Sequence, residues 1–222
     1  MSLFRANRIG IGLAAAAFAL SGALYRRLPD VMPTHWDIHG AVDGTTPKPW
    51  GPFVMPLVMA GVLLVFAVLP RISPRGYSIE RFRTVFAVIR TALLGFLFVM
   101  NAVVLLAGLG VSFRMERVVQ AGMGVLFMVL GNYLGKVTKN FFVGIRTPWT
   151  LASDEVWLRT HRVGGMLFVA AGLACVVSAF LDHGWFVLMI AVGVAAVVPV
   201  VYSYVLYRRI EGFGKDDHPD QG

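Results

Sequence analysis

Charged residues are scarce in this chain. Only 14% of its 222 residues are Asp, Glu, Lys or Arg, whereas 57% are hydrophobic, and the mean hydropathy is +0.72. Soluble globular domains carry about 25% charged residues, so the composition excludes an ordinary soluble domain. The chain has the composition of an integral membrane protein.

The apolar stretches lack the alternation of polar and apolar residues that marks a transmembrane β-barrel. They are continuous, and six of them approach or reach the roughly 20 residues that a helix needs to cross a bilayer. These stretches are about 9–25, 52–70, 85–109, 118–134, 163–181 and 185–207. We predict an all-α polytopic membrane protein, a bundle of six transmembrane helices in which the first stretch is retained as a span.

The sequence has a single cysteine and lacks the common hydrolase motifs. Cys175 is the single cysteine, so the chain has no internal disulfide. The sequence contains no HExxH, no GxSxG and no pair of aspartates inside a span. We therefore name no catalytic residue, and a metal-dependent intramembrane enzyme remains an alternative without an acid, base or nucleophile assigned to it.

Acidic residues are absent from the interiors of the spans. All 12 lie in loops, at the termini or near span ends, and Asn101 is the clearest deep polar residue. Ion-coupled transport normally requires ionisable groups inside the bundle, so this distribution disfavours a secondary transporter. A membrane facilitator with a neutral pathway remains an alternative.

Lysine and arginine are distributed unevenly among the connections. Of the 20, 14 lie at the two ends or in the second and fourth connections, five lie in the first and third, and Arg90 lies inside a span. Positively charged connections stay on the cytoplasmic side, which predicts that both termini are cytoplasmic. The basic excess is thus explained by topology and anionic lipid, and we do not expect direct nucleic-acid binding.

The fourth connection interrupts the apolar pattern with NFFVGIRTPWTLASDEVWLRTHR, residues 140–162. Thr150 or Ser153 can cap a helix there, and Arg159 follows Glu155 at the spacing of a helical ion pair. We predict that this helix continues into the fifth span. Before it, Arg146 lies in a Gly-Pro frame and can bind backbone carbonyls or Glu155, so we predict that Arg146 is the polar centre of the loop.

Residues 131–165, GNYLGKVTKNFFVGIRTPWTLASDEVWLRTHRVGG, closely resemble the signature of the SdpI family of bacterial multi-spanning immunity proteins. A Leu134-Gly135 pair stands where the family often has Met-Pro. Together with Gly131 this forms a GxxxG spacing, which lets a neighbouring helix approach closely. The resemblance assigns to a functional loop the residues Asn132, Lys136, Asn140, Gly144, Arg146, Thr147, Pro148, Trp149, Thr150, Glu155, Trp157 and His161.

The first connection, LPDVMPTHWDIHGAVDGTTPKPWG at residues 28–51, resembles the uncharacterised domain often found at the N-terminus of SdpI-like proteins. We predict a folded outer cap in which Pro33 and Thr34 start a short helix and Asp43-Gly44 forms a turn. The residues that we single out in this cap are Pro33, His35, Trp36, Gly40, Asp43 and Gly44.

Histidines of the outer connections raise the alternative of a metal site. The predicted helix would place His35 and His39 on one face, and His183 in the fifth connection would supply a third ligand on the same side of the membrane. The other interpretation is a cap whose histidines are hydrogen-bonded. We expect no required cofactor, with a divalent metal such as zinc at the outer loops as the alternative.

The SdpI resemblance implies a multi-pass protein of the bacterial cytoplasmic (inner) membrane that protects the cell from a secreted, membrane-active peptide toxin. It also implies coupling to a cytoplasmic transcriptional regulator. The expected partners are therefore the lipid bilayer, a peptide toxin and such a regulator. We divide the chain into 1–70 with the outer-loop cap at 26–51, 71–117 with the third span, 118–210 as the SdpI-like region with its cytoplasmic loop at 136–163, and a flexible cytoplasmic tail at 211–222.

Overall fold

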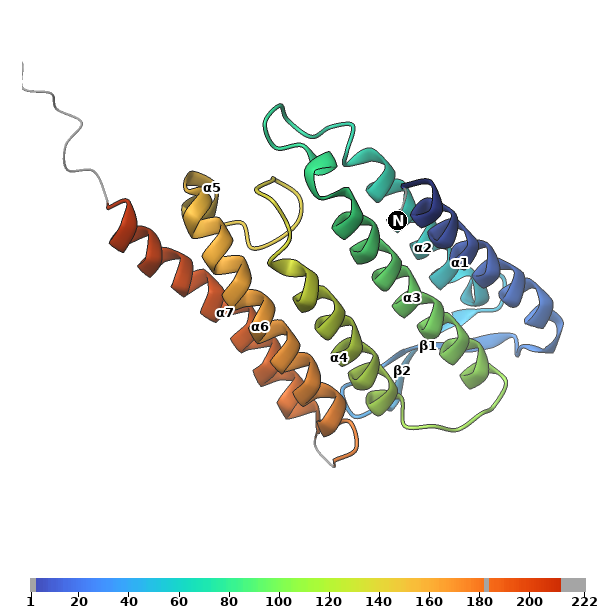
Figure 1. The fold of residues 1–222 in the computed structure, drawn as a ribbon. Helices are drawn as coiled ribbons and strands as arrows, with labels where there is room; N and C mark the ends of the chain where they lie inside the picture. Colours follow the sequence, from blue (N-terminus) through green and yellow to red (C-terminus); the bar gives the residue numbers. More distant parts are fainter. Residues whose placement is uncertain (1–2, 182–183, 213–222) are drawn as a thin grey trace, which may run out of the picture.

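The computed structural model describes residues 3–181 and 184–212 (Figure 1). Within this part of the chain six helices are long and apolar enough to cross a membrane, which confirms the predicted helical bundle. They are α1 (Leu3–Leu24), α2 (Val54–Val68), α3 (Arg83–Gly108), α4 (Met115–Leu134), α6 (Asp154–Ser178) and α7 (Gly184–Ile210). The remaining helices are short: α5 (Pro148–Ala152) and the 3-10 helices η1 (Tyr25–Arg27), η2 (Gly51–Phe53) and η3 (Ile79–Phe82).

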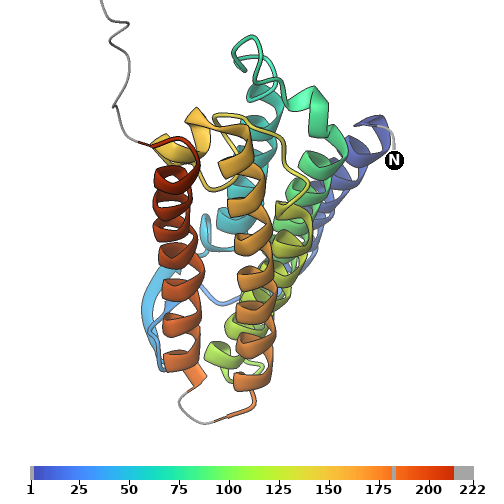
Figure 2. The same ribbon diagram turned by 60° about the vertical axis from the view of Figure 1, so that its left-hand side comes forward.

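The six long helices form two groups. Helices α1, α2 and α3 pack together, α6 lies between α4 and α7, and α3 meets α4 where the groups join (Figures 1 and 2). The start of α1 and the end of α7 lie at the same end of the bundle (Figure 1). We call this the loop end, because it also carries residues 135–147 and α5, and we call the opposite end the hairpin end. That the loop end is cytoplasmic remains a prediction.

Glycines let α4 and α6 approach each other closely. A Cβ added at Gly124 would lie 2.6 Å from the carbonyl oxygen of Gly172, and one added at Gly131 would lie 2.6 Å from that of Gly165. Atoms at this distance overlap, so these positions accept no side chain without moving the backbone. The predicted close approach at Gly131 is confirmed, whereas a Cβ at Gly135 would meet its nearest atom at an ordinary 3.6 Å.

The first connection folds into a β-hairpin, in which β1 (Val31–Trp36) pairs antiparallel with β2 (Val42–Pro47). The prediction of a short helix from Pro33 and Thr34 is therefore wrong. β-Branched residues occur in both segments, and β1 also ends in Trp36; such residues favour extended backbone. A two-stranded sheet has only edge strands, so Pro33, which has no N–H, is tolerated.

The turn of this hairpin precedes the predicted position. The Asp37 carboxylate accepts hydrogen bonds of 2.9 Å from the backbone N–H groups of His39 and Ala41, which closes the turn. The N–H of Ala41 is the main group that holds the pKa of Asp37 below its ordinary value. Asp43 and Gly44 lie within β2, so the predicted turn at these residues is wrong.

Candidate functional site

The base of the hairpin is fixed to the first helix group by Met32. Its side chain is fully buried and packs with Leu28 and with Val104 and Leu105 of α3. A Cβ added at Gly108 would lie 2.9 Å from the Met32 methyl carbon, so the end of α3 also lies against it. Burial of this apolar cluster holds β1 against α3.

The tip of the hairpin reaches the second helix group. Gly40 has a φ of +81°, and a Cβ added there would collide with the carboxylate of Glu116 on α4. The ring of His39 packs edge-on against Trp185 at the start of α7, with 5.8 Å between ring centroids. The hairpin therefore spans both groups, with its base on α3 and its tip on α4 and α7 (Figure 1).

A pocket of about 340 Å³ lies under the hairpin, where it meets α2, α3, α4 and α7. Its lining is mainly apolar. Methionine side chains are flexible and polarizable, so a lining rich in them adapts to apolar groups of different shape. The methionines and tryptophans that line it are Met55, Met100, Met115, Met189, Trp36 and Trp185.

A second pocket, of about 320 Å³, adjoins the first and is more polar. Arg114, Arg117 and His39 line it, and Glu116 and Trp185 are among the residues that line both pockets. The Arg114 Nε donates a hydrogen bond of 2.6 Å to the Glu116 carboxylate. The hairpin end therefore places an apolar and a charged compartment side by side, an arrangement that suits an amphipathic ligand.

Gln120 lines both pockets and connects three helices. Its buried side-chain nitrogen donates to the Ser178 hydroxyl at 2.5 Å and to the Gly184 carbonyl at 2.7 Å, which ties α4 to the end of α6 and the start of α7. Sequence reasoning missed this residue. The available signal was an uncharged polar residue within an apolar span, where side-chain hydrogen bonds between helices are favoured.

The outer histidines have separate contacts. The His35 Nδ1 lies 2.5 Å from a carboxylate oxygen of Asp43 across the hairpin, and both side chains are largely exposed. His39 lies in the turn, against Trp185, so the predicted shared helix face does not exist. His183 lies outside the described residues. Within 3–181 and 184–212, no three His, Cys, Asp or Glu side chains gather as a metal site would need.

At the loop end, Asn140 organises the connection between α4 and α5. Its side chain is fully buried, and its nitrogen donates to the carbonyls of Thr138 and Val143 at 2.8 and 2.9 Å. Its oxygen accepts from the N–H groups of Phe142 and Val143 at 2.8 and 2.7 Å. One amide thus satisfies four backbone groups, which fixes the turn.

His161 holds the next part of the loop. Its Nε2 accepts a hydrogen bond of 3.0 Å from the backbone N–H of Ile145, and its Nδ1 lies 2.8 Å from the carbonyl of Trp157. Since a carbonyl can only accept, Nδ1 carries the proton and the buried imidazole is neutral. Gly144 has a φ of +112°, and a Cβ there would collide with the imidazole, so the position needs glycine for two reasons.

A capping box begins α5. The Thr147 N–H donates to the Thr150 hydroxyl at 2.9 Å, and the Thr150 N–H donates to the Thr147 hydroxyl at 3.1 Å. Pro148 follows the cap, where its missing N–H costs nothing. The Thr147 hydroxyl also lies 3.0 Å from that of Ser203, and Trp149 packs on Tyr204, so the motif is attached to α7.

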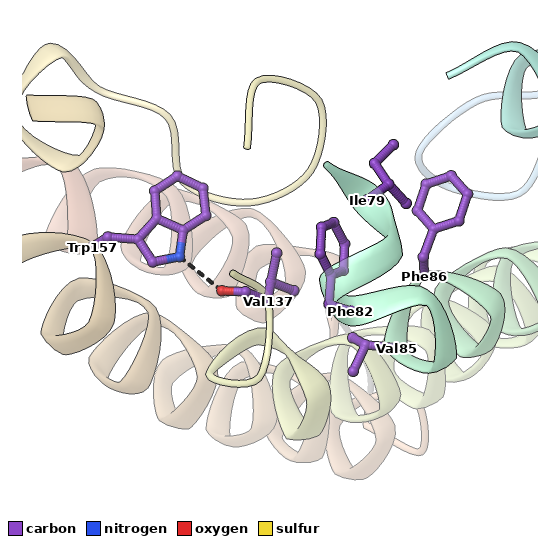
Figure 3. Close-up of a cluster of buried hydrophobic side chains, with 6 residues drawn as sticks. All are labelled: Ile79, Phe82, Val85, Phe86, Val137 and Trp157. Carbon is purple, nitrogen blue, oxygen red and sulfur yellow. Dashed lines mark hydrogen bonds between the residues drawn. The ribbon is translucent and has the colours of Figure 1, made fainter. Parts of the chain in front are cut away.

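The same loop is packed against the first helix group (Figure 3). The Trp157 indole N–H donates to the Val137 carbonyl at 2.7 Å. Both side chains are buried in one cluster with residues of η3 and α3, namely Ile79, Phe82, Val85 and Phe86. The two helix groups are therefore joined at both ends, by the hairpin at one and by this cluster at the other.

The remaining motif residues lie at the surface of the loop end. Arg146 is exposed and donates to the Phe141 carbonyl, so it holds a backbone carbonyl as predicted but is not the buried centre. Glu155 pairs with Arg159 at 2.5 Å. Asn132 and Lys136 line a separate surface pocket between α4 and α6, and the Lys136 ammonium lies over the Tyr133 ring at 4.7 Å.

These features define a multi-pass helical membrane protein with a ligand-sized pocket at one end and a buried polar network at the other. Residues 136–203 match the SdpI/YfhL protein family, and residues 12–60 match a domain of unknown function, DUF1648. The chain is 26% identical over 208 residues to Immunity protein SdpI of Bacillus subtilis (strain 168), covering 93% of this chain and 98% of that protein. Both predicted resemblances are confirmed as similarities of these segments and of the chain as a whole. No solved structure matches it.

Proposed function

We propose that this protein is an immunity protein of the bacterial cytoplasmic membrane that protects its own cell from a secreted, membrane-active peptide. The observation that carries the proposal is the similarity to Immunity protein SdpI, which extends along 93% of the chain. A sequence match of this length is not confined to one motif, because it extends over the hairpin and the loop end as well as the helices.

The pocket under the hairpin is the proposed site for the peptide. The charge distribution of the connections predicts that the hairpin end faces outward, toward a secreted ligand. An apolar side chain of the peptide would enter the methionine-lined pocket, and a neighbouring polar group would lie in the compartment formed with Arg114 and Arg117. A membrane-active peptide is amphipathic, as this pair of compartments requires.

The loop end is the proposed contact for a cytoplasmic regulator. Arg146 and Phe141 are exposed there while their backbone is held by the Asn140 and His161 network. Photocrosslinking from position 141 in intact cells, with and without the peptide, tests this assignment. A crosslinked partner that appears only with the peptide would support coupling, and identical patterns in both conditions would contradict it.

The immunity proposal is tested by deleting the gene in its host. We expect the deletion strain to be killed by conditioned medium from the parent strain, and to be rescued by the wild-type gene. Val119 of α4 lines the pocket, so Val119→Phe should fill part of it and abolish the rescue. Val125 on the same helix is 51% exposed and lies away from the pocket, so Val125→Phe should still rescue.

The two parts of the proposal fail separately. A deletion strain that survives as well as the parent, in medium shown to kill an unrelated sensitive strain, would contradict the immunity function. Sensitivity of the deletion strain together with full rescue by Val119→Phe, at equal amounts of protein in the membrane, would remove only the pocket from the proposal.

A further inference from the structure

A pocket of about 610 Å³ lies at the loop end of the first helix group and shares no lining residue with the two pockets under the hairpin. It is lined by α1, by the end of α2, by η3 and by α3. Four of the lining residues are charged: Arg71, Glu80, Arg83 and Arg90. Three guanidinium groups and one carboxylate give the pocket an excess of two positive charges.

Arg90 forms the deep end of this pocket. It is only 4% exposed, although it lies within a membrane-spanning helix. Arg83 precedes it by seven residues, so both lie on one face of α3, about 10 Å apart along the axis. A Cβ added at Gly10 would lie 3.7 Å from the Arg90 Nε, so α1 covers this side chain. An arginine in an apolar span extends toward the nearest polar boundary, here the loop end.

The carboxylate does not neutralise the pocket. The ion pair between the Glu80 carboxylate and the Arg83 guanidinium is 3.9 Å long, and both side chains are more than half exposed. Such a pair contributes little, because solvent screens it. Arg71 donates to the carbonyl of Ala67 at the end of α2, which orients its guanidinium without neutralising its charge.

The walls between these charges are apolar. Ile11, Leu63, Leu64, Phe66 and Phe86 line the same pocket. Leu64 is 66% exposed on the outer surface of the bundle, so the apolar wall continues into the region of the lipid chains. A soluble anion would use the arginines but gain nothing from this wall, whereas a phospholipid would use both.

We propose that this pocket binds an anionic phospholipid. Its phosphate lies among the guanidinium groups of Arg71, Arg83 and Arg90, and an acyl chain lies along the apolar faces of α1 and α2. Guanidinium groups bind phosphate oxygens through paired hydrogen bonds, and basic pockets between transmembrane helices at the cytoplasmic side are suited to acidic head groups. The site does not depend on the immunity function.

The test compares two double variants of the purified full-length chain. Arg71→Gln with Arg83→Gln removes two pocket charges, and Arg75→Gln with Arg81→Gln removes two charges from the same connection outside the pocket. All four side chains are exposed, so both proteins should fold. Each protein is incubated in mild detergent with equal amounts of phosphatidylglycerol and phosphatidylcholine of the same acyl chains, and the retained lipid is measured by native mass spectrometry.

We expect the wild type and the Arg75 and Arg81 variant to retain phosphatidylglycerol in preference to phosphatidylcholine. The pocket variant should lose this preference by about fivefold for each arginine removed. Equal retention of the two lipids by the wild type, or equal losses in the two variants, would overturn the proposal. Displacement of phosphatidylglycerol by millimolar glycerol 3-phosphate would also overturn it, because a soluble phosphate would then suffice.

Discussion

Replacing Asn140 by alanine should loosen the loop end while leaving the six spans in place. The buried amide bonds the carbonyls of Thr138 and Val143 and the N–H groups of Phe142 and Val143, at 2.7 to 2.9 Å. Alanine provides none of these bonds. The four backbone groups then remain unsatisfied in the folded loop, or the loop opens to let water reach them.

The magnitude follows from the number of bonds. A hydrogen bond contributes a net 0.5 to 1.5 kcal/mol, so four of them sum to about 2 to 6 kcal/mol. The loop lies at the ends of the helices, where local opening admits water, and we therefore expect about 2 to 4 kcal/mol for Asn140→Ala. Asn140→Asp keeps both accepted bonds but places a buried carboxylate oxygen against the carbonyls of Thr138 and Val143, so it should cost at least as much as Asn140→Ala.

Reversible unfolding in mixed micelles with increasing dodecyl sulfate measures the free energy of unfolding for each variant. Asn132→Ala is the matched control, because Asn132 is exposed and lies on α4, eight residues before Asn140 in the sequence. Its effect should be within about 0.5 kcal/mol of zero, as for most surface substitutions. If Asn140→Ala were as stable as Asn132→Ala, the buried amide would not organise this loop.

Three further predictions concern packing, pH and topology. Gly131→Ala should destabilise the protein by about 1 to 3 kcal/mol, because the added Cβ overlaps the α6 backbone. Gly95→Ala has open space around it and should stabilise α3 by up to about 1 kcal/mol. Unfolding midpoints that shift in the same direction for both variants would contradict this. The pKa of Asp37 is lowered on folding, so its contribution to hairpin stability is present above the ordinary aspartate pKa and lost as pH falls through the lower folded value. Hydrogen exchange in the turn should accelerate, relative to intrinsic rates, over that acid range, and Asp37→Asn should show the faster exchange already at neutral pH. Reporter fusions after Pro47 and Lys215 should report the outside and the inside, respectively, and the reverse result would invert every assignment of sides.

The spans were predictable because a continuous apolar stretch of bilayer length is a signal carried by the segment itself. The start of α6 was predictable for a similar reason. Ser153 precedes two acidic residues, and in the structure its hydroxyl accepts the Val156 N–H at 3.4 Å. Both signals are local, and no distant contact reverses them.

The hairpin was not predictable from local signals, because the same residues fit a helix start. Pro33-Thr34 followed by two histidines four residues apart is compatible with a first helical turn. The extended form is selected by burial of Met32 against α3 and by the cross-strand pairing, which are long-range contacts. Their energy exceeds the small local preference of a short polar segment.

The centre of the loop was predicted at the wrong side chain for a chemical reason. Arginine has five donors and no acceptor, so Arg146 can bind carbonyls but cannot satisfy the N–H groups of a tight turn. Asn140 has both functions on a short side chain, and a neutral His161 accepts a further N–H. Arg146 was predicted as the centre because it is charged. The loop instead requires side chains that can accept hydrogen bonds from backbone N–H groups, and these are Asn140 and His161.

The position of the hairpin tip bears on the order in which the protein is made. The hairpin follows α1 and is synthesised early, yet its tip rests on Glu116 of α4 and Trp185 of α7. Until the last helix leaves the ribosome and enters the bilayer, the pocket under the hairpin lacks one wall. A nascent chain or a truncated product that ends before Gly184 therefore carries a hairpin without a completed pocket, and the proposed peptide site forms only once α7 is in place.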